Sequence, residues 1–279
     1  MNLDVEWQGV LTNQTPLIHG GESLGTVQYL KRSRFFSADG TLMDIPVISG
    51  NAIRGALRDF SASKFHAFLG QPKLTLAQSH LLWAGGSISK ARRLPLSGER
   101  LRTLRNAIPH IGLFGGSAAG RVISGALTVH TALPLCKELQ HLLPADFQSN
   151  NSPSYWDIVQ LDEYSRFPDN QEDEESQTLL MRYGVESFIP GTRFFWRTGV
   201  QARNEIEVSY FNDLLEDFLT QGLQVGGNKA RGYGVLKGQP FTPDPSSLSP
   251  SEAKAPRWED QLSQQFTIEE IMSSFKEVQ

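Results

Sequence analysis

Two amphipathic helical patterns with strand patterns around them constrain the fold of this chain more than any other feature. Apolar residues recur every three or four positions over residues 49–70 and again over 208–222, as is typical of helices that bury one face. Ser49 or Asn51 can cap the start of the first helix, and Gly70 can end it. The two apolar stripes comprise Ile53, Leu57, Phe60, Phe68, Val208, Phe211, Leu215 and Phe218.

Strand patterns flank both predicted helices. Alternating apolar residues predict strands over about 2–11, 126–133, 186–201 and 233–237, and residues 27–46 contain a hairpin turn at Ala38-Asp39-Gly40. The core order is therefore strand, helix, two strands, helix, strand, with large insertions. This order is that of the split β-α-β plan of a ferredoxin-like or modified RNA-recognition-motif fold, in which two helices cover one face of an antiparallel sheet. We expect an α+β protein of this type.

Length and composition predict one elaborated domain. The chain has 279 residues, of which 39% are hydrophobic, so it can bury a sizeable core. We expect this domain over residues 1–240, followed by a linker and a short helix over 241–279. The single Cys136 excludes an intramolecular disulfide and a cysteine-built zinc site, and the six histidines show no close ligand spacing. We therefore expect no metal and no cofactor.

No apolar run approaches the ~20 residues that a membrane span needs, and the first residues lack the pattern of a signal peptide. We therefore expect a cytoplasmic protein without a membrane partner.

Charge is segregated along the chain. Residues 1–135 hold 14 Lys and Arg against 7 Asp and Glu, whereas residues 136–279 hold 12 against 23. A basic cluster between residues 85 and 125 fits a phosphate-binding surface, because each neutralised phosphate releases counterions; a solvated helix face fits it equally well. The cluster comprises Lys90, Arg92, Arg93, Arg100, Arg102, Arg105 and Arg121, with Glu99 as its one acidic member.

The start of the first helix is a candidate phosphate clamp. Ser49-Gly50-Asn51 would present unpaired backbone N–H groups at the positive end of the helix dipole, with Arg54 and Arg58 one and two turns further on. The alternative is an ordinary capped helix whose arginines are solvated.

The glycine-rich stretch "GGNKARGYG", residues 226–234, is a second candidate site. Glycine allows positive φ and a close approach of another chain, the two cations supply charge, and Tyr233 offers a ring for base stacking. The stretch follows a helix and leads into a strand, so it is neither a Walker A loop nor a dinucleotide fingerprint. A nucleic-acid backbone suits it, although a tight turn with incidental charges remains the alternative.

Four fragments in a fixed order resemble a known family. "IHGG" near the N-terminus, "IPVISGNAIRGALRD", "LFGG" and "GGNKARGYG" resemble the RAMP superfamily of CRISPR systems over roughly Leu3 to Lys237. The resemblance is greatest to the Cas-seven-type backbone subunits that coat the guide RNA (crRNA) in type IV-like or type III-like class 1 effector complexes. It implies an RNA-recognition-motif palm, a basic finger-like region at about 70–120 and a β-hairpin thumb at about 157–186.

The resemblance also implies site residues and partners. The expected partners are crRNA, a target nucleic acid, further copies of the chain stacked into a helical filament, and other CRISPR effector subunits. The expected RNA-binding residues are His19, Gly20, Lys31, Arg32, Arg34, Ser49, Gly50, Asn51, Arg54, Arg58, Gly226, Gly227, Asn228, Lys229, Arg231, Gly232, Tyr233 and Gly234. The candidate wedge residues of the thumb are Phe167, Leu179, Leu180 and Met181.

One departure from the family argues against catalysis. Members that cut target RNA resemble one another in an aspartate between the first strand and the first helix, where this chain has Gln28 or Tyr29. Neither can act as a carboxylate, although Asp39 and Asp44 lie nearby in sequence. We therefore expect a non-catalytic subunit, with DNA favoured over RNA as the target. The alternatives are a target-RNA endonuclease of a type III-like complex, a histidine-based RNA-processing centre at His19, and a free-standing RNA-binding module.

Overall fold

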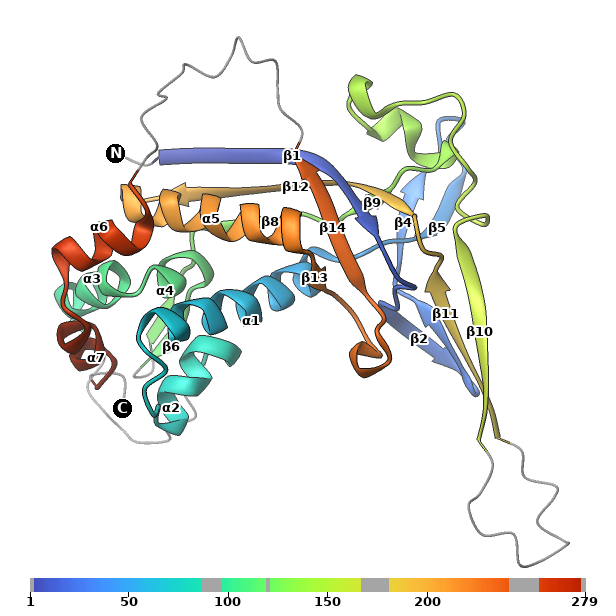
Figure 1. Ribbon diagram of the computed structural model, residues 1–279. Helices are drawn as coiled ribbons and strands as arrows, with labels where there is room; N and C mark the ends of the chain where they lie inside the picture. Colours follow the sequence, from blue (N-terminus) through green and yellow to red (C-terminus); the bar gives the residue numbers. More distant parts are fainter. Residues whose placement is uncertain (1–2, 87–96, 119–120, 167–180, 241–255, 277–279) are drawn as a thin grey trace, which may run out of the picture.

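The computed structural model describes residues 3–86, 97–118, 121–166, 181–240 and 256–276 (Figure 1). Its main sheet is built around β1 (Leu3–Asn13), which pairs antiparallel with β12 (Arg193–Ala202) on one side and with β14 (Val235–Pro240) on the other. Two short strands, β8 (Leu127–Val129) and β9 (Leu133–Pro134), pair antiparallel with the other edge of β12. A third, β13 (Leu223–Gln224), pairs antiparallel with β14. The strand order is β13-β14-β1-β12-β8. The predicted α+β class is confirmed.

Two long helices cover one face of this sheet, as predicted (Figure 1). Helix α1 spans Gly50–Phe68, and the Ser49 hydroxyl accepts a hydrogen bond from the Ala52 N–H at 3.3 Å. Helix α5 spans Glu205–Gln221 and begins before the predicted position, because the Asn204 side chain caps it by accepting from the Glu207 N–H at 2.9 Å.

The apolar stripes of the two helices form the main core with the sheet. Trp196 of β12 and Phe218 of α5 meet edge to face, with ring centroids 5.5 Å apart. Both side chains are fully buried, as is Phe65 of α1. Among the described residues, no helix combines the length and apolar character needed to cross a membrane.

A second sheet lies beside the main one and contains a long hairpin (Figure 1). Its order is β10 (Val159–Arg166), β11 (Met181–Phe188), β3 (Val27–Leu30) and β2 (Gly20–Leu24). Strands β10 and β11 pair antiparallel within the segment expected to be the thumb. The β10–β11 hairpin is thus present, while its function as a thumb stays a prediction.

The basic segment after β3 forms a separate hairpin. Strands β4 (Arg32–Phe36) and β5 (Leu42–Pro46) pair antiparallel around the predicted turn. The Asp39 carboxylate accepts from the Ser37 hydroxyl and from the Thr41 N–H, and these hydrogen bonds lower its pKa. The turn prediction is confirmed.

The insertion after α1 is mostly helical. It contains α2 (Leu76–Ser79), a π-helical turn at His80–Ala84, α3 (Gly98–Ala107), α4 (Pro109–Phe114), and the short paired strands β6 (Gly116–Ala118) and β7 (Arg121–Ile123). Short 3₁₀ helices follow further along the chain at Lys137–Leu142 and Ala145–Phe147.

The basic cluster of this insertion serves mixed purposes. Arg105 is buried, pairs with Glu207 at 3.4 Å and donates to the Ser124 carbonyl, whereas Arg102 is exposed. Lys90, Arg92 and Arg93 lie outside the described residues. For Arg105, both interpretations of the cluster are wrong, because its guanidinium is neither solvated nor available to phosphate.

The C-terminal tail is more than a linker and one short helix. It contains α6 (Trp258–Gln265) as well as the predicted helix, α7 (Ile268–Lys276). Trp258, Leu262, Ile271 and Phe275 are all buried in the main core. The expectation that the globular unit ends at residue 240 was therefore wrong: the tail supplies part of its core.

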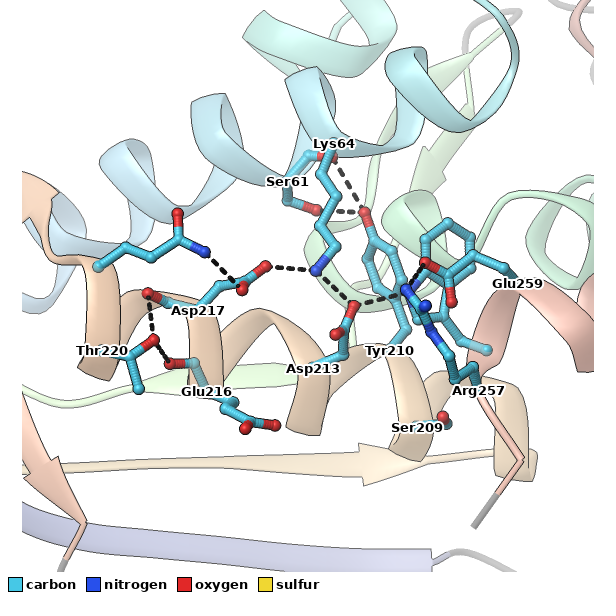
Figure 2. Close-up of polar contacts among 12 residues, drawn as sticks. Ser61, Lys64, Ser209, Tyr210, Asp213, Glu216, Asp217, Thr220, Arg257 and Glu259 are labelled. Atoms are coloured by element: carbon cyan, nitrogen blue, oxygen red, sulfur yellow. Dashed lines mark hydrogen bonds and ion pairs between the residues drawn. The ribbon is translucent and has the colours of Figure 1, made fainter. Parts of the chain in front are cut away.

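Polar contacts join three helices at this junction (Figure 2). The Lys64 ammonium of α1 contacts the carboxylates of Asp213 and Asp217 on α5, and the Trp258 indole N–H donates to Asp213 at 2.7 Å. Burial opposes the charged form of Lys64, but the two carboxylates outweigh it and raise the pKa of the ammonium. Trp258 thus holds the tail in two ways: its ring is buried in the core, and its indole N–H bonds to Asp213 of this cluster.

We expect Trp258→Ala to lower the free energy of unfolding by about 3–5 kcal/mol, because it leaves a cavity in the core and an unpaired acceptor on Asp213. Urea denaturation followed by circular dichroism measures the change. Gln264→Ala, at an exposed position of the same helix, should change stability by less than about 0.5 kcal/mol. Equal effects of the two substitutions would show that the tail does not belong to the folded core.

We expect Lys64→Met to destabilise the protein by roughly 2 kcal/mol, less than the ~3–5 kcal/mol of a fully buried pair. The substitution leaves two neighbouring carboxylates without their shared cation. The same urea measurement applies, with Lys73→Met at an exposed position as the control. If both variants match the wild type, the cluster has no stabilising role.

Candidate nucleic-acid interface

Main-chain hydrogen bonds bring three of the four family-like fragments together. The Lys31 N–H donates to the His19 carbonyl at 2.7 Å, and the Lys31 carbonyl accepts from the Val47 N–H at 2.9 Å. On the neighbouring segment, the Gly227 N–H donates to the Ile18 carbonyl at 2.8 Å. The start of α1, the "IHGG" segment and the glycine-rich stretch therefore lie side by side, as the predicted shared site requires.

The glycine loop, residues 226–234, folds as a compact exposed turn. Asn228 has a left-handed backbone with φ of 54°, and Lys229–Arg231 form one 3₁₀ turn. Gly226 and Gly234 have positive φ, and a Cβ there would lie 2.0 and 2.1 Å from carbonyl oxygens of the chain. Only glycine fits these two positions.

The two cations of the glycine loop, Lys229 and Arg231, are both exposed. The loop therefore presents positive charge on a backbone with little side-chain bulk.

Tyr233 of the glycine loop is held by its hydroxyl group. It is half-buried, and its hydroxyl shares a hydrogen bond with the Tyr164 hydroxyl of β10 at 2.6 Å. This bond, together with burial and the nearby Asp162 carboxylate, raises the pKa of Tyr233. The Arg231 guanidinium lies over the Tyr164 ring, 4.8 Å from its centroid. Tyr233 thus anchors the loop through its hydroxyl, while the stacking role expected from the sequence stays a prediction.

The start of α1 has one exposed polar side chain. Asn51 is exposed, whereas Gly50 is buried and a Cβ there would lie 2.3 Å from the Val129 carbonyl oxygen. Ser49 is half-buried, and its hydroxyl serves as the cap. Of these three residues, Asn51 is therefore the side chain that can reach a ligand.

Arg54 and Arg58 turn toward the protein. Arg54 donates to the Leu127 carbonyl at 2.6 Å and to the Phe114 carbonyl at 2.9 Å, and Arg58 donates to the Phe114 carbonyl at 2.8 Å. Both guanidinium groups lie over the Phe114 ring, and burial lowers the pKa of each. The solvated-arginine alternative is wrong, and phosphate contact through these donors would require breaking bonds that hold α1 to α4.

The remaining predicted cations differ in availability. Lys31 is exposed, whereas Arg32 is half-buried and pairs with Glu186 at 2.6 Å. Arg34 is largely exposed and pairs with Asp44 at 3.4 Å. Lys31 therefore joins the loop cations as an accessible positive group.

His19 and Gly20 lie beside Lys31. The His19 side chain is half-buried, and burial, with a smaller contribution from Lys31, lowers its pKa. A neutral imidazole at physiological pH adds no cationic contact. Gly20 is exposed at the start of β2.

The predicted wedge residues Phe167, Leu179 and Leu180 lie outside the described residues, and Met181 begins β11. The sequence reasoning missed Tyr164 and Asp162, which lie against the glycine loop. No local pattern could have found them, because their contacts join residues about 70 positions apart.

The sheet face away from α1 and α5 carries no exposed aromatic platform on β1 and β12. Residues alternate between faces along β12, so Phe195 and Arg197 lie opposite Trp196. Phe195 is only 6% exposed and packs on Phe147 with ring centroids 4.9 Å apart. A shallow cavity of about 430 Å³ lies on this face, and it is lined by polar groups that include His130 and Arg197.

The two aspartates that the sequence offered as catalytic alternatives, Asp39 and Asp44, have structural partners. Asp39 closes the β4–β5 turn and Asp44 pairs with Arg34. In the part of the chain that the structure describes, no three His, Cys, Asp or Glu side chains are grouped so that they could hold a metal ion.

Comparisons with known proteins identify the family of this chain. The chain is similar to one chain of a solved structure described as a Type IV-B CRISPR complex, with 26% sequence identity, a TM-score of 0.64, and coverage of 91% of this chain and 96% of the other. No curated protein matches the chain significantly. The family model of the RAMP superfamily matches residues 15–237, and these residues include every segment of the interface described above. The chain belongs to the RAMP superfamily.

Proposed function

We propose that this chain is a non-catalytic backbone subunit of a CRISPR effector complex. It binds the guide RNA along the surface formed by the glycine loop, Lys31 and the start of α1. The observation that carries the proposal is the hydrogen-bonded convergence of these three segments. It places Lys229 and Arg231 on an exposed turn, and the exposed side chain of Lys31 on the link between β3 and β4. Exposed cations on slender turns suit a phosphate backbone.

The sheet order supports a palm of the RNA-recognition-motif type. With the short strand β8 as second strand, the four core strands lie in the order fourth, first, third, second, and two helices cover one face. Such a palm with a hairpin beside it can bind one stretch of guide and contact the next copy. Head-to-tail repetition of one contact builds an open filament, and the similarity to a chain of a Type IV-B complex favours such an assembly with other effector subunits.

Two alternatives have less support. A target-RNA endonuclease needs a carboxylate near Gln28 and Tyr29, but Asp39 and Asp44 are committed to a turn and an ion pair. A free-standing module of the usual kind would stack bases on aromatic side chains of the open sheet face, where Phe195 is covered. We therefore favour a subunit that presents the guide for pairing, with DNA as the favoured target.

We expect Lys229→Ala combined with Arg231→Ala to weaken binding of single-stranded RNA about tenfold, and to reduce the slope of log affinity against log salt by about one to two. Fluorescence anisotropy between 50 and 200 mM salt, about the range used for such slopes, measures both quantities. Lys137→Ala with Arg203→Ala removes the same charge from exposed positions outside the candidate binding segments and should have little effect. An equal loss of RNA affinity in both double variants would show that the glycine loop is not part of the RNA-binding site.

We expect co-expression with a guide RNA to yield multimers whose mass rises with guide length, because each copy covers a fixed stretch of RNA. Size-exclusion chromatography with light scattering measures this mass. The purified assembly should leave guide-paired RNA intact in the presence of Mg²⁺. Regularly spaced Mg²⁺-dependent cleavage would establish the endonuclease instead, and one copy per RNA of any length would favour the free-standing module.

A further inference from the structure

We propose that Tyr164 and Asp162 of β10 are positioning residues that hold the glycine loop in its binding conformation and orient Arg231. This inference rests on the proposed function, because it concerns the same surface. It assigns to the β10–β11 hairpin a second role, that of a rigid support for the glycine loop.

The glycine loop is fixed at its two ends by main-chain bonds. The Gly227 N–H donates to the Ile18 carbonyl at 2.8 Å, and the Gly234 N–H donates to the Pro16 carbonyl at 2.8 Å. Between these ends the main-chain bonds of the exposed turn are short-range, such as Arg231 N–H to the Asn228 carbonyl at 2.9 Å. An exposed turn of small residues has many accessible conformations, so an additional anchor reduces the entropy lost when RNA binds.

Tyr233 provides that anchor through Tyr164. The two hydroxyl oxygens are 2.6 Å apart, and the Tyr233 hydroxyl also lies 3.4 Å from an Asp162 carboxylate oxygen. Asp162 is itself held, because the Ser187 hydroxyl and the Gln160 amide each donate to it at 2.9 Å. The hydroxyl pair therefore connects the loop to a side-chain network on two paired strands.

The Tyr164 ring also determines where Arg231 lies. The guanidinium carbon is 4.8 Å from the ring centroid. A guanidinium stacked on an aromatic face keeps its in-plane N–H donors free at the edges, where they can bind a phosphate. The ring thus restricts Arg231 without consuming its donors, in contrast to Arg54 and Arg58, whose donors bind carbonyl groups.

Four substitutions separate the contributions of hydroxyl, ring and charge. Tyr164→Phe and Tyr233→Phe each remove the hydroxyl pair but keep both rings. Tyr164→Leu removes the ring beneath Arg231, and Arg231→Ala removes the cation. Tyr155→Phe is the matched control, because Tyr155 belongs to a separate buried cluster with Ile45, Cys136 and Leu139.

The first readout is hydrogen exchange of the RNA-free protein. We expect Tyr164→Phe and Tyr233→Phe each to accelerate amide exchange in the glycine loop about 3- to 10-fold, the effect of losing one hydrogen bond, with the exchange of α1 unchanged. Tyr155→Phe should leave loop exchange unaltered. Exchange equal to that of the wild type in both hydroxyl variants would overturn the inference, whether or not the protein binds RNA.

The second readout is RNA affinity in two double-mutant cycles. We expect each hydroxyl variant to weaken binding of single-stranded RNA about 3- to 10-fold, and the double Tyr→Phe variant to be no weaker than either single one. Tyr164→Leu combined with Arg231→Ala should bind no more weakly than Tyr164→Phe combined with Arg231→Ala, because the ring itself, apart from the hydroxyl, acts through that guanidinium. Additive losses in both cycles would contradict the positioning role. Failure of the wild-type chain to bind RNA would instead contradict the proposed function.

Discussion

The surface that we propose for RNA depends on a set of main-chain hydrogen bonds across a short stretch of backbone. Lys31 bonds on one side to His19 and on the other to Val47, and Ile18 accepts from Gly227. Main-chain bonds of this kind fix backbone positions independently of side-chain rotamers. They therefore set the separation between the start of α1 and the glycine loop, and exposed side chains are needed only for the charge that meets a ligand.

The core beneath the main sheet holds this surface in place. Both long helices and the tail contribute to one apolar core, in which Trp258 packs among side chains of α1 and α5. The arginines of α1 also stabilise this arrangement, because they donate hydrogen bonds to carbonyl groups of α4 and β8. The chain thus uses several cations for internal structure, while others, among them Lys31, Lys229 and Arg231, face solvent.

Several elements of the fold could be predicted from particular residues. The Ser49 cap and Gly70 delimited α1, and Ala38-Asp39-Gly40 located the β4–β5 turn. The predicted start of α5 was a few residues too late, because the capping residue, Asn204, lies outside the apolar stripe. Helix α6 was missed because it has few apolar residues. Trp258 and Leu262 become buried only by packing against residues that are distant in the sequence, such as those of α5.

For the candidate site, the sequence alone indicated two local segments that suit a ligand, a capped helix start and a glycine-rich loop. Capping, turn geometry and periodicity depend on neighbours within a few residues, so they can be deduced from the sequence. Only the tertiary structure decided which cations remain available, that Tyr233 bonds to Tyr164, and that the tail enters the core. These outcomes depend on groups that are distant in sequence and close in space, where packing and hydrogen bonding determine whether a side chain faces the protein or the solvent.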